Sequence, residues 1–225
     1  ILHTHHHRDQ CQGDYLAAGK RIPIAVPAYE YHLFADVENF WRNRRVFHEG
    51  YETRNDYFSL TASVPVAAKL HDYETIRWAG RQFFVLPAPG HTLGSVTLLT
   101  EIDGRKVAFS GDLMHSAGKV LTLHDLQHHY GSYEGIDFAI FSLEALRREK
   151  PEMLCPSHGN PLNDPDTALQ ETISPLSEYY RFATGLQPTV ENLPFAVSPH
   201  LVASDKTACN FYVIISDSGK GMFID

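Results

Sequence analysis

The sequence has few cysteines, no long apolar run and no excess of positive charge. Its three cysteines, Cys11, Cys155 and Cys209, lie far apart and form no CxxC pair, which disfavours a disulfide framework and predicts reduced thiols in a cytoplasmic protein. No segment reads as a signal peptide or is apolar enough to cross a bilayer, so no membrane partner is expected. The net charge of −8 argues against a nucleic-acid partner, because nucleic-acid-binding proteins usually present a basic face.

The 225 residues are 43% hydrophobic and 20% charged, which is sufficient for one large domain with a buried core. Strand-like segments alternate with helical ones, and this order favours an α/β sandwich. Residues 112–133 read as a long loop or lid, and Asp103-Gly104 reads as a hairpin turn. The predicted strands are residues 22–26, 74–78, 82–86, 95–101, 106–110 and 153–155, and the predicted helices are residues 14–19, 29–45, 137–149 and 164–182.

Histidine is abundant, with 14 residues, and the segment 4–10 reads Thr-His-His-His-Arg-Asp-Gln. In an extended segment, residues two apart point the same way, which groups His5, His7 and Asp9 and turns His6 the other way. His3 and His6 are left out of the candidate ligands. Neutral imidazoles and a carboxylate suit zinc and similar metals. The competing interpretation of this run alone is a tag remnant or a solvated stretch. If the run is instead a metal site, three of its residues are candidate ligands: His5, His7 and Asp9.

Three further candidate ligands each follow a predicted strand and stand next to a glycine. They are His91 after Gly90, Asp112 after Gly111, and His158 before Gly159. Glycine allows the backbone to turn tightly at such places, and sites in open α/β layouts assemble at the carboxyl ends of strands. Any one of these residues alone would be ordinary. Together, in this order, they predict a shared metal centre.

This set of motifs resembles the metallo-β-lactamase superfamily, particularly its glyoxalase II-like hydrolases, over about residues 1–182. The resemblance implies a four-layer αββα sandwich with the site at one edge of its two sheets. It also implies zinc as one or two ions, with iron or manganese as alternatives. The implied ligands are His5, His7 and His91 for the first metal, Asp9 and His158 for the second, and Asp112 as a bridge between them.

Gln10 departs from the pattern, because the family usually has a histidine at this position. An amide oxygen is a weaker ligand than imidazole for a borderline metal. Three outcomes stay open: a weakly bound second metal, ligation through the Gln10 carbonyl oxygen, or a single metal. A weakly bound second metal is preferred to a single metal.

The implied activity is hydrolysis of a small-molecule thioester, ester, lactone or amide by metal-activated hydroxide. The expected catalytic residues are Asp9, Asp112 and His115, the last of which could assist proton transfer. The alternatives are an iron-dependent dioxygenase of the persulfide type with one metal, and a non-catalytic metal-binding relic. Cys11 is interpreted as a small buried residue that supports the loop, in preference to a nucleophile. A homodimer remains open.

Residues 208–225 resemble the opening hairpin of the same superfamily, which in relatives precedes the histidine-rich motif. Two explanations stay open. Either the order is permuted and residues 195–225 supply the missing first strands, or the chain is a piece of a longer protein in which a second copy starts near residue 195. The expected domains are a catalytic domain, 1–185, and a linker with a hairpin, 186–225. Because proteins avoid open sheet edges, residues 200–225 are predicted to pair with the sheet next to residues 1–4.

Overall fold

The computed structural model describes residues 1–43, 59–120, 135–184, 195–204 and 211–224. It divides into two compact units, Ile1–Ala183 and Thr184–Asp225. Most of the predicted lid, residues 121–134, lies outside the described residues. Of the helices that are described, none combines the length and the apolar character needed to span a bilayer.

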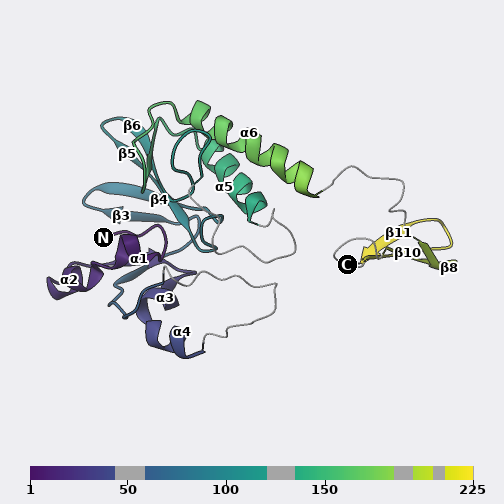
Figure 1. Ribbon diagram of the computed structural model, residues 1–225, viewed down its shortest axis with the longest axis horizontal. Coiled ribbons are helices and arrows are strands. Elements are labelled where there is room, and N and C mark those ends of the chain that lie inside the picture. The colour runs from purple at the N-terminus through teal and green to yellow at the C-terminus, as the bar shows by residue number, and fades with distance from the viewer. Residues whose placement is uncertain (44–58, 121–134, 185–194, 205–210, 225) are drawn as a thin grey trace. The chain divides into compact units, whose positions relative to one another are not determined.

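A five-stranded sheet in the order β3-β4-β5-β6-β7 forms the centre of the first unit (Figure 1). Its strands confirm five of the predicted ones to within one or two residues at each end. All neighbours are antiparallel except β6 and β7. A parallel pair needs a crossover connection, and helix α5 (Ile136–Arg148) lies in this one. The strands are β3 (Thr75–Trp78), β4 (Arg81–Pro87), β5 (Val96–Ile102), β6 (Arg105–Gly111) and β7 (Met153–Pro156).

The turn between β5 and β6 is the one that its sequence predicts. Asp103 and Gly104 both have positive φ, 52° and 76°, which is the conformation that a two-residue hairpin turn requires and that Asp-Gly tolerates. The last helix of the first unit, α6 (Pro165–Thr184), also begins as predicted, with Thr167 N donating to Asp164 Oδ1 at 3.3 Å. It continues through Pro175.

Side chains of the central strands alternate between two apolar clusters, because successive residues of a strand point to opposite faces. Leu86 and Leu99 pack on one face with α5 and α6, whereas Val85 and Leu98 pack on the other. The second face meets a two-stranded parallel sheet of β1 (Ala25–Pro27) and β2 (Ala68–Leu70). A third cluster, around Phe34, lies under the amino-terminal helices.

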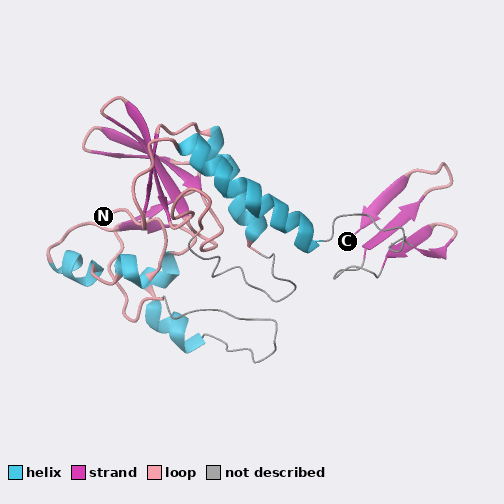
Figure 2. Ribbon diagram, turned by 45° about the horizontal axis from the view of Figure 1, so that its top comes forward, coloured by secondary structure: helices cyan, strands magenta, loops and turns pink. Residues whose placement is uncertain are grey.

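Three apolar clusters thus separate four layers, helices, sheet, sheet and helices, and the predicted αββα sandwich is confirmed (Figure 2). The amino-terminal layer contains α1 (Arg8–Cys11), α2 (Asp14–Gly19), α3 (Tyr31–Ala35) and α4 (Val37–Asn43). Of these, α2 was predicted, and α1 replaces the loop expected after His7. The predicted strand at residues 22–26 is shifted to β1, and β2 was not predicted.

The single helix predicted over residues 29–45 is wrong, because the structure has two helices, α3 and α4, with a break at Asp36 (φ −136°, ψ 48°). Tertiary hydrogen bonds take the backbone groups that a continuous helix would use. Val37 N donates to Ser63 Oγ at 2.9 Å, and Phe34 O accepts from Val64 N at 2.9 Å. These partners come from a distant segment, so the helical periodicity of the sequence does not reveal the break.

The second unit contains its own antiparallel sheet in the order β11-β10-β9-β8. Its strands are β8 (Phe195–Ser198), β9 (Leu201–Ser204), β10 (Phe211–Ile215) and β11 (Gly221–Ile224). Within this unit the four described strands pair with one another. The pairing of residues 200–225 with the sheet next to residues 1–4 stays a prediction.

Within the first unit, the backbone of residues 1–4 pairs with two segments. Ala25 N donates to Ile1 O at 2.9 Å, His3 N donates to Ala25 O at 3.0 Å, and Val96 N donates to Thr4 O at 2.8 Å. The opening segment is therefore tied to β1 on one side and to the start of β5 at its end. That a second copy of the fold begins near residue 195 stays a prediction.

Candidate metal centre

Three strands bring candidate ligands to one edge of the five-stranded sheet. β4, β6 and β7 run in the same direction, because β5 is antiparallel to β4 and β6, and β7 is parallel to β6. Their carboxyl ends therefore meet at one edge, and His91, Asp112 and His158 follow these ends in turn. Ser157 N donates to Gly111 O at 2.9 Å, which places the residues after β6 and β7 side by side.

The histidine-rich opening segment reaches the same edge. The hydrogen bond from Val96 N to Thr4 O places Thr4 beside the start of β5. Gly111 permits this close approach, since a Cβ at position 111 would lie 2.6 Å from Thr4 Oγ1. Gly111 also has a φ of +57°, which other residues adopt only at a cost. The glycine next to Asp112 is thus needed for packing as well as for the turn.

The first group of candidate ligands consists of four buried residues: His5, His7, His91 and Asp112. The three imidazole rings meet edge to face, with centroids 4.9, 4.9 and 4.7 Å apart. His7 Nδ1 lies 2.9 Å from His91 Nε2. Asp112 Oδ2 lies 3.4 Å from His5 Nε2 and 3.2 Å from His91 Nε2. One donor atom of each residue therefore points to a common centre.

This donor set fits a divalent metal ion. Imidazole nitrogens and a carboxylate are typical zinc ligands. Asp112 Oδ1 is buried and has no hydrogen bond to any residue that the structure describes, although buried polar atoms are normally paired. Burial alone would raise the pKa of Asp112, but hydrogen bonds from His5 and His91 and the charge on those rings outweigh it and hold the pKa far below its usual range. The carboxylate is therefore ionised and suited to a cation.

The second group consists of Asp9, Asp112 and His158. His158 Nε2 lies 3.0 Å from Asp9 Oδ2 and 3.8 Å from Asp112 Oδ2. The side chains of Asp9 and His158 are each 40% exposed, whereas that of Asp112 is 1% exposed. The second group is therefore open to solvent, and it shares Asp112 with the closed first group.

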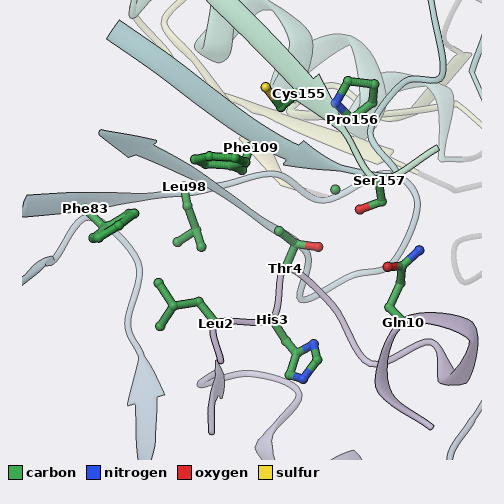
Figure 3. Close-up of a pocket in the computed structure, with 11 residues that line it drawn as sticks. Leu2, His3, Thr4, Gln10, Phe83, Leu98, Phe109, Cys155, Pro156 and Ser157 are labelled. Carbon is green, nitrogen blue, oxygen red and sulfur yellow. The ribbon is translucent and has the colours of Figure 1, made fainter. Parts of the chain in front are cut away.

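Gln10, on helix α1, extends the second group. Its Nε2 atom lies 3.3 Å from His158 Nε2. Gln10 also borders a pocket of about 470 Å³ whose other lining side chains include Leu2, Phe83 and Leu98. In Figure 3, Gln10 lies at one side of this pocket and the apolar residues lie at the other. The side chain at position 10 can therefore influence both the second group and the pocket.

His3 and His6 both contact carboxylates outside the first group, although an extended pattern predicts this only for His6. His3 Nε2 lies 2.8 Å from Asp14 Oδ2, and His6 Nδ1 lies 3.1 Å from Glu30 Oε2. Both carboxylates are buried, and neither was predicted from the sequence to belong to the site. In the sequence, Asp14 and Glu30 are each a single acidic residue among mostly apolar neighbours, and their histidine partners become apparent only in the fold.

Cys11 occupies the supporting position that the sequence analysis preferred. Its side chain is fully buried, and its thiol lies 3.4 Å from both His5 O and His3 Nδ1. Burial raises the pKa of the Cys11 thiol, so a thiolate nucleophile is disfavoured. His3, Cys11 and Asp14 are also close enough together to hold a metal ion, but each of them already contacts another member of the trio.

His115 lies next to the second group without belonging to it. A Cβ at Gly159 would lie 3.2 Å from the His115 ring, so this ring packs beside the residue that follows His158. His115 Nδ1 lies 3.3 Å from Ser116 Oγ. Its role in proton transfer stays a prediction.

No protein-family model and no curated protein sequence matches the chain. Solved structures do match it. The B3 metallo-β-lactamase BLEG-1 has a TM-score of 0.56 at 20% identity, over 79% of this chain and 76% of that one. The metallo-β-lactamase FEZ-1 from Legionella gormanii has a TM-score of 0.55 at 15% identity, over 80% of this chain and 73% of that one. A metallo-β-lactamase family protein from Thermus thermophilus has a TM-score of 0.52 at 16% identity, over 86% of this chain and 74% of that one.

Proposed function

We propose that this chain, which has the metallo-β-lactamase fold, is a metal-dependent hydrolase of a small-molecule thioester, ester, lactone or amide. The observation that carries the proposal is the pair of adjoining ligand groups that share Asp112. One is closed and rich in imidazole, and the other is open to solvent. The names of the structural neighbours support hydrolytic chemistry.

In this proposal His5, His7 and His91 would hold the first ion, Asp9 and His158 would hold the second, and Asp112, which belongs to both ligand groups, would contribute to both. Zinc is the expected ion, as one or two per chain, and iron or manganese would also accept such ligands. When bound, the metal would lower the pKa of water toward neutrality, supply hydroxide as the nucleophile and stabilise the oxyanion.

The chain's own residues prepare the site. Asp112 holds the rings of His5 and His91 in place through contacts of 3.4 and 3.2 Å. Asp9 is partly exposed and lies 3.0 Å from His158 Nε2, so it can orient a nucleophile or accept its proton. His115, beside Gly159, is the candidate for returning a proton to the leaving group.

The experiment that tests the proposal starts with the metal content of the purified protein and continues with a screen of thioester and lactone hydrolysis. Asp112→Ala should abolish the activity found. The matched control is Asp72→Ala, which removes an exposed carboxylate from the turn before β3 and should leave activity unchanged. A protein that binds no metal, or that keeps its activity after Asp112→Ala, would contradict the proposal. An effect of Asp112→Ala on stability alone would indicate a non-catalytic metal-binding relic.

The second candidate function is an iron-dependent dioxygenase of the persulfide type. The observation that favours it is Gln10, which stands beside His158 where an imidazole would complete a second metal site. Elemental analysis that finds one iron and no zinc would favour this candidate over the hydrolase.

A further inference from the structure

Glu30 connects the two segments that carry the three histidines of the first group. It lies just after β1, it is 2% exposed and it belongs to neither ligand group. Its Oε2 atom lies 3.1 Å from Nδ1 of His6, the residue between His5 and His7. Its Oε1 atom accepts hydrogen bonds from the hydroxyl of Thr92, the residue after His91, and from Gly94 N at 3.1 Å.

The surroundings of Glu30 are built around its carboxylate. A buried carboxylate is costly unless its oxygens are paired. Oε1 of Glu30 accepts two hydrogen bonds, and Oε2 lies within ion-pair distance of His6 Nδ1. Gly94 leaves the necessary room, since a Cβ there would lie 2.4 Å from Glu30 Cγ. No positive φ requires glycine at position 94. The close approach of Glu30 is therefore the reason for this glycine.

The two segments that Glu30 connects meet at the candidate metal centre itself. His7 Nδ1 and His91 Nε2 lie 2.9 Å apart. The His6 ring, which Glu30 contacts, packs edge to face on the His7 ring with centroids 4.8 Å apart. On the other side, Thr92 Oγ1 also lies 2.6 Å from Ser95 Oγ, which accepts from Thr92 N at 3.2 Å. A carboxylate held on both sides by such short contacts sets the separation of the two segments.

We propose that Glu30 is a positioning residue that sets the spacing of His7 and His91 and thereby the metal affinity of the first group. The inference rests on the proposed function, because it concerns the same metal site. Glu30 acts through His6 and Thr92 and does not itself ligate the ion. Outer contacts of this kind usually change metal affinity by about 10- to 100-fold when they are removed.

The test measures zinc affinity of the metal-depleted full chain by competition with a chromophoric chelator, and stability by urea unfolding. Glu30→Ala should weaken zinc binding by about 10- to 100-fold. Glu30→Gln keeps the size and one acceptor oxygen, so it should lose less. The control is Asp14→Asn, which changes another buried carboxylate. Asp14 contacts the imidazole of His3 and, within the described part of the chain, has no hydrogen bond or ion pair with the His91 segment. This variant should lower zinc affinity less than Glu30→Ala does.

A double variant separates packing from positioning. Gly94→Ala alone should destabilise the chain, because its Cβ would collide with Glu30 Cγ. In Glu30→Ala/Gly94→Ala that atom is gone, so the new methyl group has room and part of the stability should return. Zinc affinity should stay low, since the link between His6 and Thr92 is still missing.

Two results would overturn this inference while leaving the proposed function intact. One is a zinc affinity of Glu30→Ala that stays within about twofold of the wild-type value. The other is a double variant in which zinc affinity recovers together with stability. A wild-type chain that binds no zinc, iron or manganese would instead overturn the proposed function, and this inference with it.

Discussion

Replacing Gln10 by histidine should strengthen the second metal site. The Gln10 amide nitrogen lies 3.3 Å from His158 Nε2, and Asp9 Oδ2 lies 3.0 Å from the same atom. Position 10 therefore already reaches the second group, and an imidazole there would add a ligand that a borderline metal prefers to an amide. Even the outer-shell partners of a metal site typically alter affinity by about 10- to 100-fold, which corresponds to about 1.4–2.8 kcal/mol, so an added ligand should contribute at least this much.

The assay is a zinc titration of the metal-depleted protein against a chromophoric chelator, with the bound metal counted by elemental analysis. Wild type should take up its second equivalent weakly, and Gln10→His should take it up at a lower free zinc concentration. The matched control is Gln12→His, because Gln12 is an exposed residue at the end of α1. The reasoning would be refuted if Gln10→His left the second equivalent unchanged, or if Gln12→His had an equal effect.

Three further predictions concern buried residues. Cys11→Ala should retain hydrolytic activity, and iodoacetamide should leave Cys11 unmodified in the folded protein, because the thiol is fully buried; mass spectrometry checks this. Leu143→Ala should lower the free energy of unfolding by about 2–5 kcal/mol in urea, since Leu143 is fully buried between α5 and the sheet. Burial alone would raise the pKa of Glu30, but the charge of His6 and hydrogen bonds from His6 and Thr92 outweigh it and lower the pKa. The stabilisation that ionised Glu30 gives the folded chain should therefore be complete above the ordinary glutamate pKa and be lost as the pH falls through the lowered pKa. Acid unfolding of Glu30→Gln should lack this contribution.

The sequence by itself determined the parts of the molecule that have local causes. Strand-like segments predicted the strands of the five-stranded sheet, and Asp103-Gly104 predicted the turn between two of them. His91, Asp112 and His158 were predicted as ligands because each is a metal-binding residue type that stands next to a glycine after a predicted strand. The structure brings these three to one edge with the opening histidines, because strands that run in the same direction end at the same edge.

Only the tertiary structure decided the features whose causes lie far away in the chain. The break at Asp36 depends on partners near residue 63, and the pairing of residues 1–4 depends on Ala25 and Val96. The importance of Glu30 depends on His6 and Thr92, which lie 24 and 62 positions from it. A side chain's own sequence neighbours set its backbone preference and polarity, but its contacts come from packing, so no local pattern could have identified these partners.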